Sequence, residues 1–367
     1  MQSVAKGPLS GIKVLEFAGM GPGPVCGMLL SDLGADVLRI DRPGASYDRY
    51  MVETRGRRSL VVDLKTEQGR QGVLALTEKA DLLVEGFRPG VMERMGLAPD
   101  TVLARNPRLV YGRMTGWGQS GPYADMAGHD INYIAITGAL HGIGPAERPV
   151  PPLNLVGDFG GGALYLAFGL LAGLRHAEQT GEGQVIDCAM TDGTIGLMGM
   201  LYGHLARGTW QDRRGVNIID GGSHFYNCYQ CSDGHWIALG AIEPQFYDEL
   251  RRRAKLDDPA FDRQLAQEDW SVLKERLAGI IATRSRNDWA ALLEGSDACF
   301  APVMSMAEAP LHPHNVARGA FVVVDDVTQP APSPRFSRTP GAIQAPPVEA
   351  GVGGKEAACE WGVNFNW

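Results

Sequence analysis

Two segments of this 367-residue sequence carry residue types that suit proton transfer. Residues 128–133 contain His129, and histidine is the side chain whose unperturbed pKa, about 6.5, lets it take up and return protons near neutral pH. Residues 156–162 contain Asp158 and end in three consecutive glycines. An imidazole and a carboxylate on opposite sides of one carbon atom can remove a proton from one face and deliver another to the opposite face. The two segments therefore make His129 and Asp158 candidates for acid/base chemistry.

Both residues also have a structural interpretation. A single histidine is more often a structural hydrogen-bonding residue than a catalyst, and Asp158 could be the N-cap of the helix expected after the glycines. A helix N-terminus stabilises a carboxylate as an anion and weakens it as a base. Burial has the opposite effect, because it raises the pKa of a carboxyl group. The sequence leaves open which of these two effects on Asp158 is larger.

The segment around His129, Ala-Gly-His-Asp-Ile-Asn-Tyr, resembles residue for residue a motif of the α-methylacyl-CoA racemases in the family III CoA-transferase superfamily. The resemblance extends from residues 8–11 to about residues 334–337, which is nearly the whole chain. It implies racemisation of 2-methylacyl-CoA thioesters by proton transfer through an enolate, with His129 and Asp158 as the two acid/base groups. It further implies an acyl-CoA substrate and an interlocked homodimer. Since coenzyme A belongs to the substrate, we expect no separate cofactor and no metal.

The resemblance also assigns supporting groups. It pairs Glu243 with His129, where a carboxylate would fix the imidazole tautomer and raise its basicity. In an interlocked dimer, Glu243 would reach His129 from a small domain across the interface. The enolate oxygen requires hydrogen-bond donors, and we expect backbone N–H groups of residues 158–160 to supply them.

Alternating strand and helix patterns determine the expected fold. Strands are predicted over residues 12–17, 36–40, 60–64, 80–85, 109–114 and 185–190, with helices over 28–33 and 67–79 and further helices over 162–177 and 191–206. This order predicts an α/β fold with a doubly wound, mostly parallel, Rossmann-like sheet. In such sheets ligands bind beyond the carboxyl ends of the strands, and that edge should carry the substrate site.

Basic residues follow three of these strand ends. Arg42, Lys65 and Arg88 lie just past strands, and Arg94 lies in the helix after one of them. Any one of them alone would be read as a solvated surface charge. A cluster drawn from several strand ends suits the phosphates of coenzyme A. Together with the resemblance, this predicts a substrate-binding set of Arg42, Val62, Asp63, Leu64, Lys65, Gly86, Phe87, Arg88, Arg94, Gly128, Asp130, Ile131, Asn132 and Tyr133.

Glycines after the first strand, followed by Asp41, raise the alternative of a dinucleotide-binding enzyme. However, no register of these glycines gives Gly-x-Gly-x-x-Gly. Pro22 and Pro24 also lack the N–H groups that would hold a pyrophosphate. The Rossmann-like fold therefore remains the expectation, while binding of a nicotinamide dinucleotide is largely excluded.

The second half of the chain predicts a smaller α+β domain. A hairpin is expected around Asp233-Gly234, followed by helices over residues 245–255, 270–283 and 287–294. We therefore expect a large domain over 1–205 completed by a returning arm over 318–367, a linker over 206–223 and a small domain over 224–317. Cys228 and Cys231 lie three positions apart, so on a strand they would face opposite sides, and no metal site is expected there.

Composition narrows the functional class. A net charge of −8 argues against a nucleic-acid-binding protein, and six scattered cysteines do not form a disulfide scaffold. The first residues lack an apolar signal segment, and no uninterrupted apolar run reaches about 18 residues. We therefore expect a cytoplasmic enzyme that does not enter a membrane.

The nearest alternative is a family III CoA transferase, in which Asp158 would be the nucleophile that forms an acyl anhydride. That branch has a flexible glycine-rich loop roughly where this chain has residues 240–243, and the bulkier, charged segment here fits the racemase pattern. A non-catalytic CoA-binding protein is a third possibility, but it gives no reason for His129, Asp158 and Glu243 to occur together.

Overall fold

The computed structural model describes residues 7–364. Its contacts divide the chain into two compact units. Unit 1 contains the described residues up to Thr137, then Leu153–Leu197, then the described residues from His314 onward, and unit 2 contains Gly138–Pro152 and Met198–Pro313. The expected boundaries at residues 205, 224 and 317, as limits of independently folding domains, stay a prediction.

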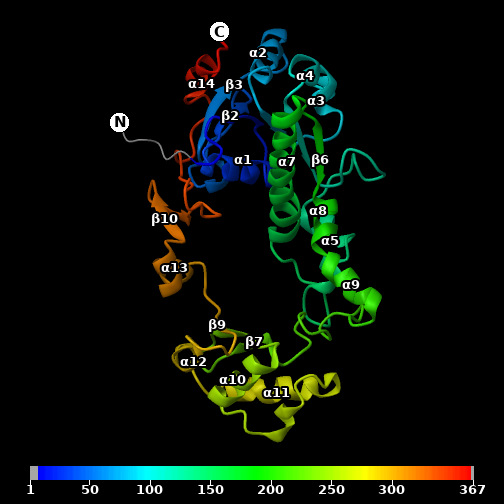
Figure 1. The fold of residues 1–367 in the computed structure, drawn as a ribbon, viewed down its shortest axis with the longest axis vertical. Helices are drawn as coiled ribbons and strands as arrows, with labels where there is room; N and C mark the ends of the chain where they lie inside the picture. The colour runs from blue at the N-terminus through cyan, green and yellow to red at the C-terminus, as the bar shows by residue number, and fades with distance from the viewer. Residues whose placement is uncertain (1–6, 365–367) are drawn as a thin grey trace. The chain divides into compact units, whose positions relative to one another are not determined.

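Unit 1 is built on a six-stranded sheet in which every pair of neighbouring strands is parallel (Figure 1). The strand order is β3-β2-β1-β4-β5-β6, so the chain winds outward from β1 in both directions. This order confirms the predicted doubly wound α/β fold. The strands are β1 (Lys13–Phe17), β2 (Asp36–Asp41), β3 (Arg57–Val61), β4 (Leu82–Glu85), β5 (Val110–Thr115) and β6 (Val185–Ala189).

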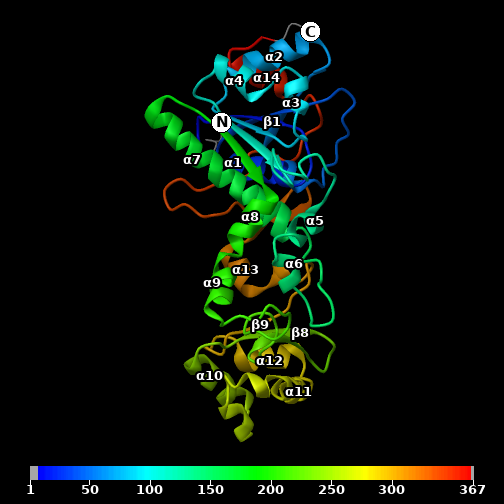
Figure 2. The same ribbon diagram turned by 90° about the vertical axis from the view of Figure 1, so that its right-hand side faces the viewer.

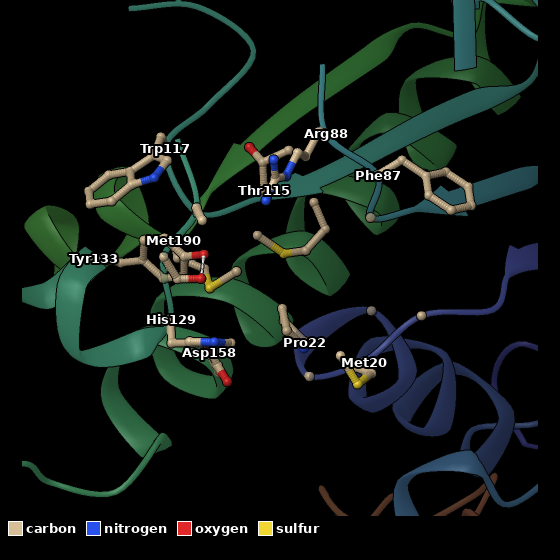
Figure 3. A pocket seen from close by; sticks show the side chains of 18 of the residues that line it. Met20, Pro22, Phe87, Arg88, Thr115, Trp117, His129, Tyr133, Asp158 and Met190 are labelled. Carbon is tan, nitrogen blue, oxygen red and sulfur yellow. Dashed lines mark hydrogen bonds between the residues drawn. The ribbon is translucent and has the colours of Figure 1, made fainter. Parts of the chain in front are cut away.

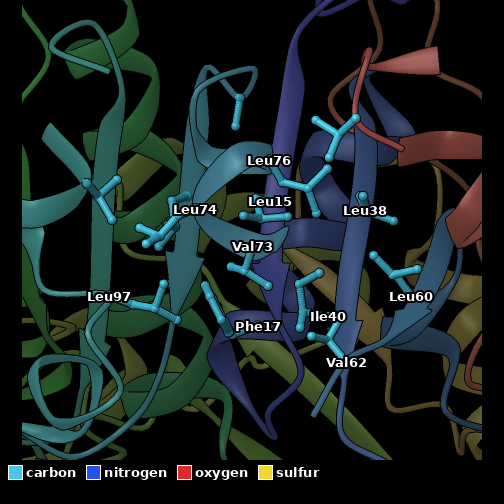
Figure 4. Packing of buried hydrophobic residues seen from close by; sticks show 14 of the residues in the cluster. Leu15, Phe17, Leu38, Ile40, Leu60, Val62, Val73, Leu74, Leu76 and Leu97 are labelled. Carbon is cyan, nitrogen blue, oxygen red and sulfur yellow. The ribbon is translucent and has the colours of Figure 1, made fainter. Parts of the chain in front are cut away.

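Helices cover both faces of this sheet because successive strand residues point to opposite sides. Leu15 of β1 packs with α2, α4 and α14, while its neighbour Val14 packs with α1 and α7. Figure 4 shows the first of these two cores, and Figure 2 shows α2, α4 and α14 gathered near one another. The helices of unit 1 include α1 (Pro22–Asp32), η1 (Val52–Thr54), α2 (Glu67–Thr77), α3 (Val91–Arg94), α4 (Pro99–Arg105), α5 (Asp130–Ala135), α7 (Tyr165–Thr180), α8 (Met190–Leu197) and α14 (Gly354–Glu360). The helix α13 (Pro313–Arg318) begins at the last residue of unit 2 and continues into unit 1.

The β3 strand begins three residues earlier than the predicted strand over 60–64. The strand also ends at Val61 and not at residue 64, so the apolar run that starts at Leu60 marked the wrong limits at both ends. Arg57 is fully buried, since its guanidinium binds the carboxylate of Glu16 on β1 at 3.0 Å. An ion pair between distant residues thus allows a charged side chain at a core position.

The helix expected over residues 162–177 is longer and begins differently. It starts with a π-helix, η2 (Leu155–Leu164), and continues as α7 to Thr180. In the described part of the chain, the stretch Leu155–Thr180 is long and apolar enough to cross a membrane by length and composition alone, which is weak evidence because core helices meet the same criterion. Leu166, Leu170 and Leu174 of this helix pack in the sheet's core.

Unit 2 contains a three-stranded antiparallel sheet in the order β7-β8-β9. The predicted hairpin is confirmed, with Gly234 at φ 80° in its turn. The helix expected over 191–206 is instead two helices that meet at Met198 and belong to different units. The elements of unit 2 are α6 (Ala139–Gly142), α9 (Gly199–Arg207), β7 (Tyr226–Gln230), β8 (Trp236–Gly240), α10 (Pro244–Ala254), η3 (Pro259–Asp262), η4 (Gln267–Asp269), α11 (Trp270–Ile281), α12 (Arg286–Leu293), β9 (Phe300–Pro302) and η5 (Ala309–Leu311). In unit 1, β10 (Phe321–Val324) and β11 (Val327–Pro330) form a separate hairpin.

The buried pair of Glu16 and Arg57 generates a stability prediction. Substitution Glu16→Gln leaves the Arg57 charge buried without its partner, which costs about 3–5 kcal/mol of the free energy of unfolding. Urea denaturation followed by tryptophan fluorescence measures this loss. The matched control is Glu249→Gln on α10, whose ion pair with Arg252 is at the surface, so its midpoint should stay near that of the wild type. A Glu16→Gln midpoint equal to the wild-type midpoint would show that the buried pair does not hold the sheet together.

Candidate active site

A cavity of about 620 Å³ lies within unit 1 at the carboxyl ends of β1, β4 and β5. Both His129 and Asp158 line it, and Figure 3 shows them near each other with Trp117 and Tyr133 close by. Electrostatic interaction between the two groups also shifts the Asp158 pKa, in agreement with this proximity. The structure therefore brings together two residues that lie twenty-nine positions apart in the sequence.

The loop after β1 forms one wall of the cavity. Gly19, Gly21 and Gly23 all line it. Gly21 has φ 71°, and a Cβ atom there would lie 3.5 Å from Oδ2 of Asp158. A side chain at this position would be strained and would also touch the carboxylate. Gly21, one of the glycines that suggested a nucleotide-binding loop, thus lies beside Asp158.

His129 is the N-cap residue of α5 and has an extended backbone. Its N–H group donates to Oδ1 of Asn132 at 3.1 Å, and the Tyr133 hydroxyl donates to the carbonyl of Gly128. Both contacts fix the backbone that carries the imidazole, because they hold the two polar groups of the one peptide unit that joins Gly128 to His129. Gly128, Asn132 and Tyr133 line the cavity as well.

The Tyr133 ring lies in a tight space between two glycines. A Cβ atom at Gly116 or Gly128 would lie 2.0 Å or 2.7 Å from the ring. On another side the ring packs edge-on against Trp117, with centroids 4.8 Å apart. Burial raises the pKa of the Tyr133 hydroxyl, so at neutral pH the hydroxyl is protonated and can donate to Gly128. Only glycine at these two positions leaves room for the ring.

Asp158 lies in the first turn of the π-helix, which corrects its interpretation as an N-cap. The N-cap residue is Asn154, whose side-chain amide donates to Oδ2 of Asp158 at 3.3 Å. Burial raises the pKa of the Asp158 carboxyl; the Asn154 hydrogen bond opposes this, the charge of Asp130 adds to it, and His129 opposes it. Of the two effects that the sequence left open, burial is the larger.

Close backbone contact holds the π-helix in place. A Cβ atom at Gly193 of α8 would lie 1.9 Å from the carbonyl oxygen of Gly161, and one at Gly161 would lie 2.7 Å from the nitrogen of Thr194. Two helices can approach this closely only through glycine. The glycines after Asp158 therefore serve helix packing, and they fix the segment from which the carboxylate projects. π-Helical segments occur frequently at functional sites.

Two of the three expected oxyanion donors already have hydrogen-bond partners within the protein. The N–H group of Asp158 donates to Oδ2 of Asp130 at 2.7 Å, and that of Phe159 donates to the carbonyl of Asn154 at 3.3 Å. The expectation that N–H groups of residues 158–160 stabilise an enolate is therefore wrong for two of its three donors. The Phe159 N–H group forms a hydrogen bond at the start of the π-helix, and the Asp158 N–H group binds the side chain of Asp130, which is distant in sequence.

The predicted phosphate-binding cations lie at the expected edge of the sheet. Arg42, Lys65 and Arg88 follow β2, β3 and β4, Arg94 ends α3, and all four side chains are exposed. Within residues 7–364 none of the four has an ion-pair partner. Arg88 lines the cavity and the other three do not.

The remaining predicted binding residues fall into three groups. Gly86 and Phe87 line the cavity, while Asp63 and Ile131 are exposed outside it. Val62 is buried in the sheet's core, with Leu64 packed partly against that core, so the Val62 side chain is not available to a ligand. Asp130 is also buried, and its carboxylate binds two backbone N–H groups.

The sequence predicts Met190 as part of an apolar wall for the acyl group, and Met190 does line the cavity. The sequence interpretation missed Met20, Met114, Met126 and Trp117, which line the cavity as well. Methionine side chains are flexible and polarisable, and they adapt to apolar groups of different shape. Met20 and Met114 follow or end β1 and β5, so the strand-end rule that selected the arginines would have found them. Met126 comes from a long loop and gives no such signal.

Glu243 belongs to unit 2, where it is the exposed N-cap residue of α10. It lies three residues after the end of β8, just beyond the hairpin as expected. Its pairing with His129 rests on the resemblance and stays a prediction.

Known proteins resemble this chain over almost its whole length. The model of CoA-transferase family III matches residues 9–351. Alpha-methylacyl-CoA racemase of Mus musculus is 43% identical over 339 residues, covering 92% of this chain and 88% of that protein. A probable fatty acyl-CoA transferase of Mycobacterium tuberculosis is 31% identical, covering 94% of this chain and 95% of that protein.

Solved structures agree with this relationship. The crystal structure of a CAIB/BAIF family protein from Brucella suis superposes with a TM-score of 0.83 and 27% identity, covering 97% of this chain and all of that one. The fold, the matched length and the sequence identity all lead to one assignment: this chain is an enzyme of CoA-transferase family III.

Proposed function

We propose that this enzyme racemises 2-methylacyl-CoA thioesters by moving the α-hydrogen between His129 and Asp158. The observation that carries the proposal is that an imidazole and a half-buried carboxyl of raised pKa line one cavity. The 43% identity to an alpha-methylacyl-CoA racemase supports it independently.

The mechanism requires that the two groups share one proton. When Asp158 holds that proton, the neutral imidazole can remove the α-hydrogen from one face while Asp158 protonates the other. When His129 holds it, the Asp158 carboxylate is the base and the roles reverse. Burial raises the Asp158 pKa above its ordinary value and so favours the protonated carboxyl. Because either group can hold the shared proton, inversion can proceed in either direction.

The substrate class follows from the surroundings of these two groups. Arg88 in the cavity suits a phosphate of coenzyme A, and the methionines suit an apolar acyl group. We retain Glu243 as the partner that would orient His129, on the resemblance alone.

Family III CoA transfer with Asp158 as nucleophile is the alternative, since a relative at 31% identity bears a transferase name. The segment where transferases carry a flexible glycine-rich loop here ends a strand and begins α10. Incubation with an acyl-CoA and an acceptor acid distinguishes the two reactions. Movement of CoA to the acid indicates a transferase, while inversion at the α-carbon without such movement indicates a racemase.

We further propose that the enzyme is a homodimer that buries an apolar surface of unit 1. Phe168 of α7 is 74% exposed, and four other exposed apolar side chains lie on η2 and α8: Leu155, Leu164, Ile195 and Leu197. A surface with this many exposed apolar side chains is typical of a protein interface. A second copy of this chain is the occupant that the resemblance implies.

Removal of either acid/base group tests the proposed reaction. The variants His129→Ala and Asp158→Ala should each lower the rate of inversion at least about 10²-fold, since each deletes one of the two proton-transfer groups. The affinity for CoA esters should stay close to that of the wild type, because neither group binds the phosphates. Chiral chromatography of the hydrolysed product measures inversion. Near-wild-type inversion by either variant would remove that residue from the mechanism.

Arg88 provides a binding prediction. Arg88→Ala should weaken the affinity for CoA esters about tenfold by loss of a charge-assisted hydrogen bond. Isothermal titration calorimetry with a non-reactive CoA thioether measures the dissociation constant. Arg108→Ala is the matched control, because Arg108 is also exposed but precedes β5 at the opposite edge of the sheet. Equal affinity of the Arg88→Ala variant and the wild type would exclude Arg88 from the phosphate site.

The dimer proposal predicts an effect of a charge on the apolar surface. Phe168→Asp should convert the dimer to a monomer, because a buried, unpaired carboxylate is costly at an interface. Light scattering after size-exclusion chromatography gives the mass in solution. Gln179→Asp on the exposed end of the same helix is the control and should remain dimeric. A monomeric wild type, or a Phe168→Asp variant that stays dimeric, contradicts the proposal.

A further inference from the structure

Asp130 follows His129 directly in the chain but does not line the cavity. Its side chain is buried, with 6% of the residue exposed. One carboxylate oxygen, Oδ2, accepts the N–H groups of both Gly157 and Asp158, each at 2.7 Å. A single buried oxygen thus joins the start of α5, where His129 lies, to the turn of the π-helix that carries Asp158.

The surrounding residues are shaped around this contact. A Cβ atom at Gly157 would lie 2.6 Å from Oδ2 of Asp130 and 3.0 Å from Cγ2 of Ile134. Glycine at position 157 is therefore what allows the carboxylate to reach the two amides. The short distances agree with charge-assisted hydrogen bonds, which are roughly twice as strong as neutral ones.

The other oxygen of the same carboxylate, Oδ1, is buried and has no hydrogen-bond partner among the described residues. A buried acceptor without a partner costs stability. The two hydrogen bonds of the other oxygen, Oδ2, must offset this cost. Both are made to the backbone that carries Asp158. The carboxylate is thus committed to the protein's own backbone.

We infer that Asp130 is a positioning residue that sets the separation between His129 and Asp158, and that it does not bind the CoA ester as the sequence suggested. The inference rests on the proposed racemase function, because it gives that separation a purpose. Two acid/base groups on opposite sides of one carbon must keep a fixed spacing, and a misplacement of about 1 Å can cost 10²-fold in rate. Asp130 can keep this spacing because it is joined to His129 by a peptide bond and to the backbone of Asp158 by a hydrogen bond.

A second consequence is electrostatic. The titratable groups that interact with the Asp158 carboxyl are His129, Asp130 and Tyr133. Burial is the main reason why the Asp158 pKa is raised, and the negative charge of Asp130 adds to it. Neutralising Asp130 should therefore lower the Asp158 pKa and shift the acidic limb of the pH–rate profile to lower pH.

Three variants separate geometry from charge. Asp130→Asn keeps the shape and removes the charge, Asp130→Ala removes the acceptor, and Gly157→Ala pushes the acceptor away while its charge remains. Asp100→Asn on α4 is the control, since Asp100 is exposed and lies outside the cavity. Measurements are kcat and KM for inversion across pH, and hydrogen–deuterium exchange of the peptide that contains residues 155–164.

We expect kcat to fall about tenfold in Asp130→Asn and about 10²-fold in Asp130→Ala and Gly157→Ala, with KM within about twofold of the wild type. Only Asp130→Asn and Asp130→Ala lose the carboxylate charge, so the acidic limb should move to lower pH in both. The amides of residues 157 and 158 should exchange faster in Asp130→Ala, a result that does not depend on any activity.

Two outcomes overturn the inference. An Asp130→Asn enzyme with wild-type kcat and an unmoved acidic limb would show that the contact does not position the pair. A raised KM with unchanged kcat would instead make Asp130 a binding residue. Failure of the proposed function is distinguishable, because the wild type would then invert no substrate, while faster amide exchange in Asp130→Ala would still report the contact.

Discussion

One carboxylate oxygen of Asp130, shared by two backbone N–H groups, connects the parts of the candidate site. The histidine and the aspartate belong to helices that come from different places in the chain, and neither helix is held at this edge by the sheet alone. Tyr133 fixes the His129 backbone by occupying the space between two glycines. Gly161 and Gly193 fix the π-helix by letting two backbones touch. Asp130 joins these two supports.

Glycine occurs in this site wherever two backbones, or a backbone and a charged group, must approach closely. Gly21 leaves room beside the Asp158 carboxylate, and Gly157 leaves room for the Asp130 carboxylate. Gly27 of α1 does the same for the buried pair of Glu16 and Arg57, since a Cβ atom there would lie 2.0 Å from Oε2 of Glu16. At Gly27 and Gly157 glycine thus permits tight packing against a buried carboxylate, at some cost in chain entropy.

The sequence predicted the sheet well because its strands are apolar, short and regularly spaced between helices. It failed where a charge is buried, as at Arg57, because the partner Glu16 lies in another strand and the pairing has no local signal. It also missed the π-helix, since Gly160, Gly161 and Gly162 look like a loop until Gly193 is placed against them. For Asp158, it offered two opposing effects on the pKa, and only the three-dimensional surroundings show that burial is the larger.

In the candidate site, too, residues with a local sequence signal were predicted and a contact between distant residues was not. His129 and Asp158 were selected by residue type and motif, and the strand-end rule located Arg88. Asp130 was assigned to the substrate because it lies inside the motif, whereas its carboxylate in fact holds the backbone of Gly157 and Asp158. Local sequence cannot distinguish these roles, since the contact spans twenty-seven residues.

The central claim is that His129 and Asp158 act on opposite faces of one carbon. The most direct measurement follows deuterium uptake from heavy water by each pure hand of a 2-methylacyl-CoA, using the His129→Ala and Asp158→Ala variants. The account predicts that each variant exchanges the α-hydrogen of only one hand, without inversion, and that the two variants exchange opposite hands. Exchange of the same hand by both variants, or of both hands by either one, would contradict it.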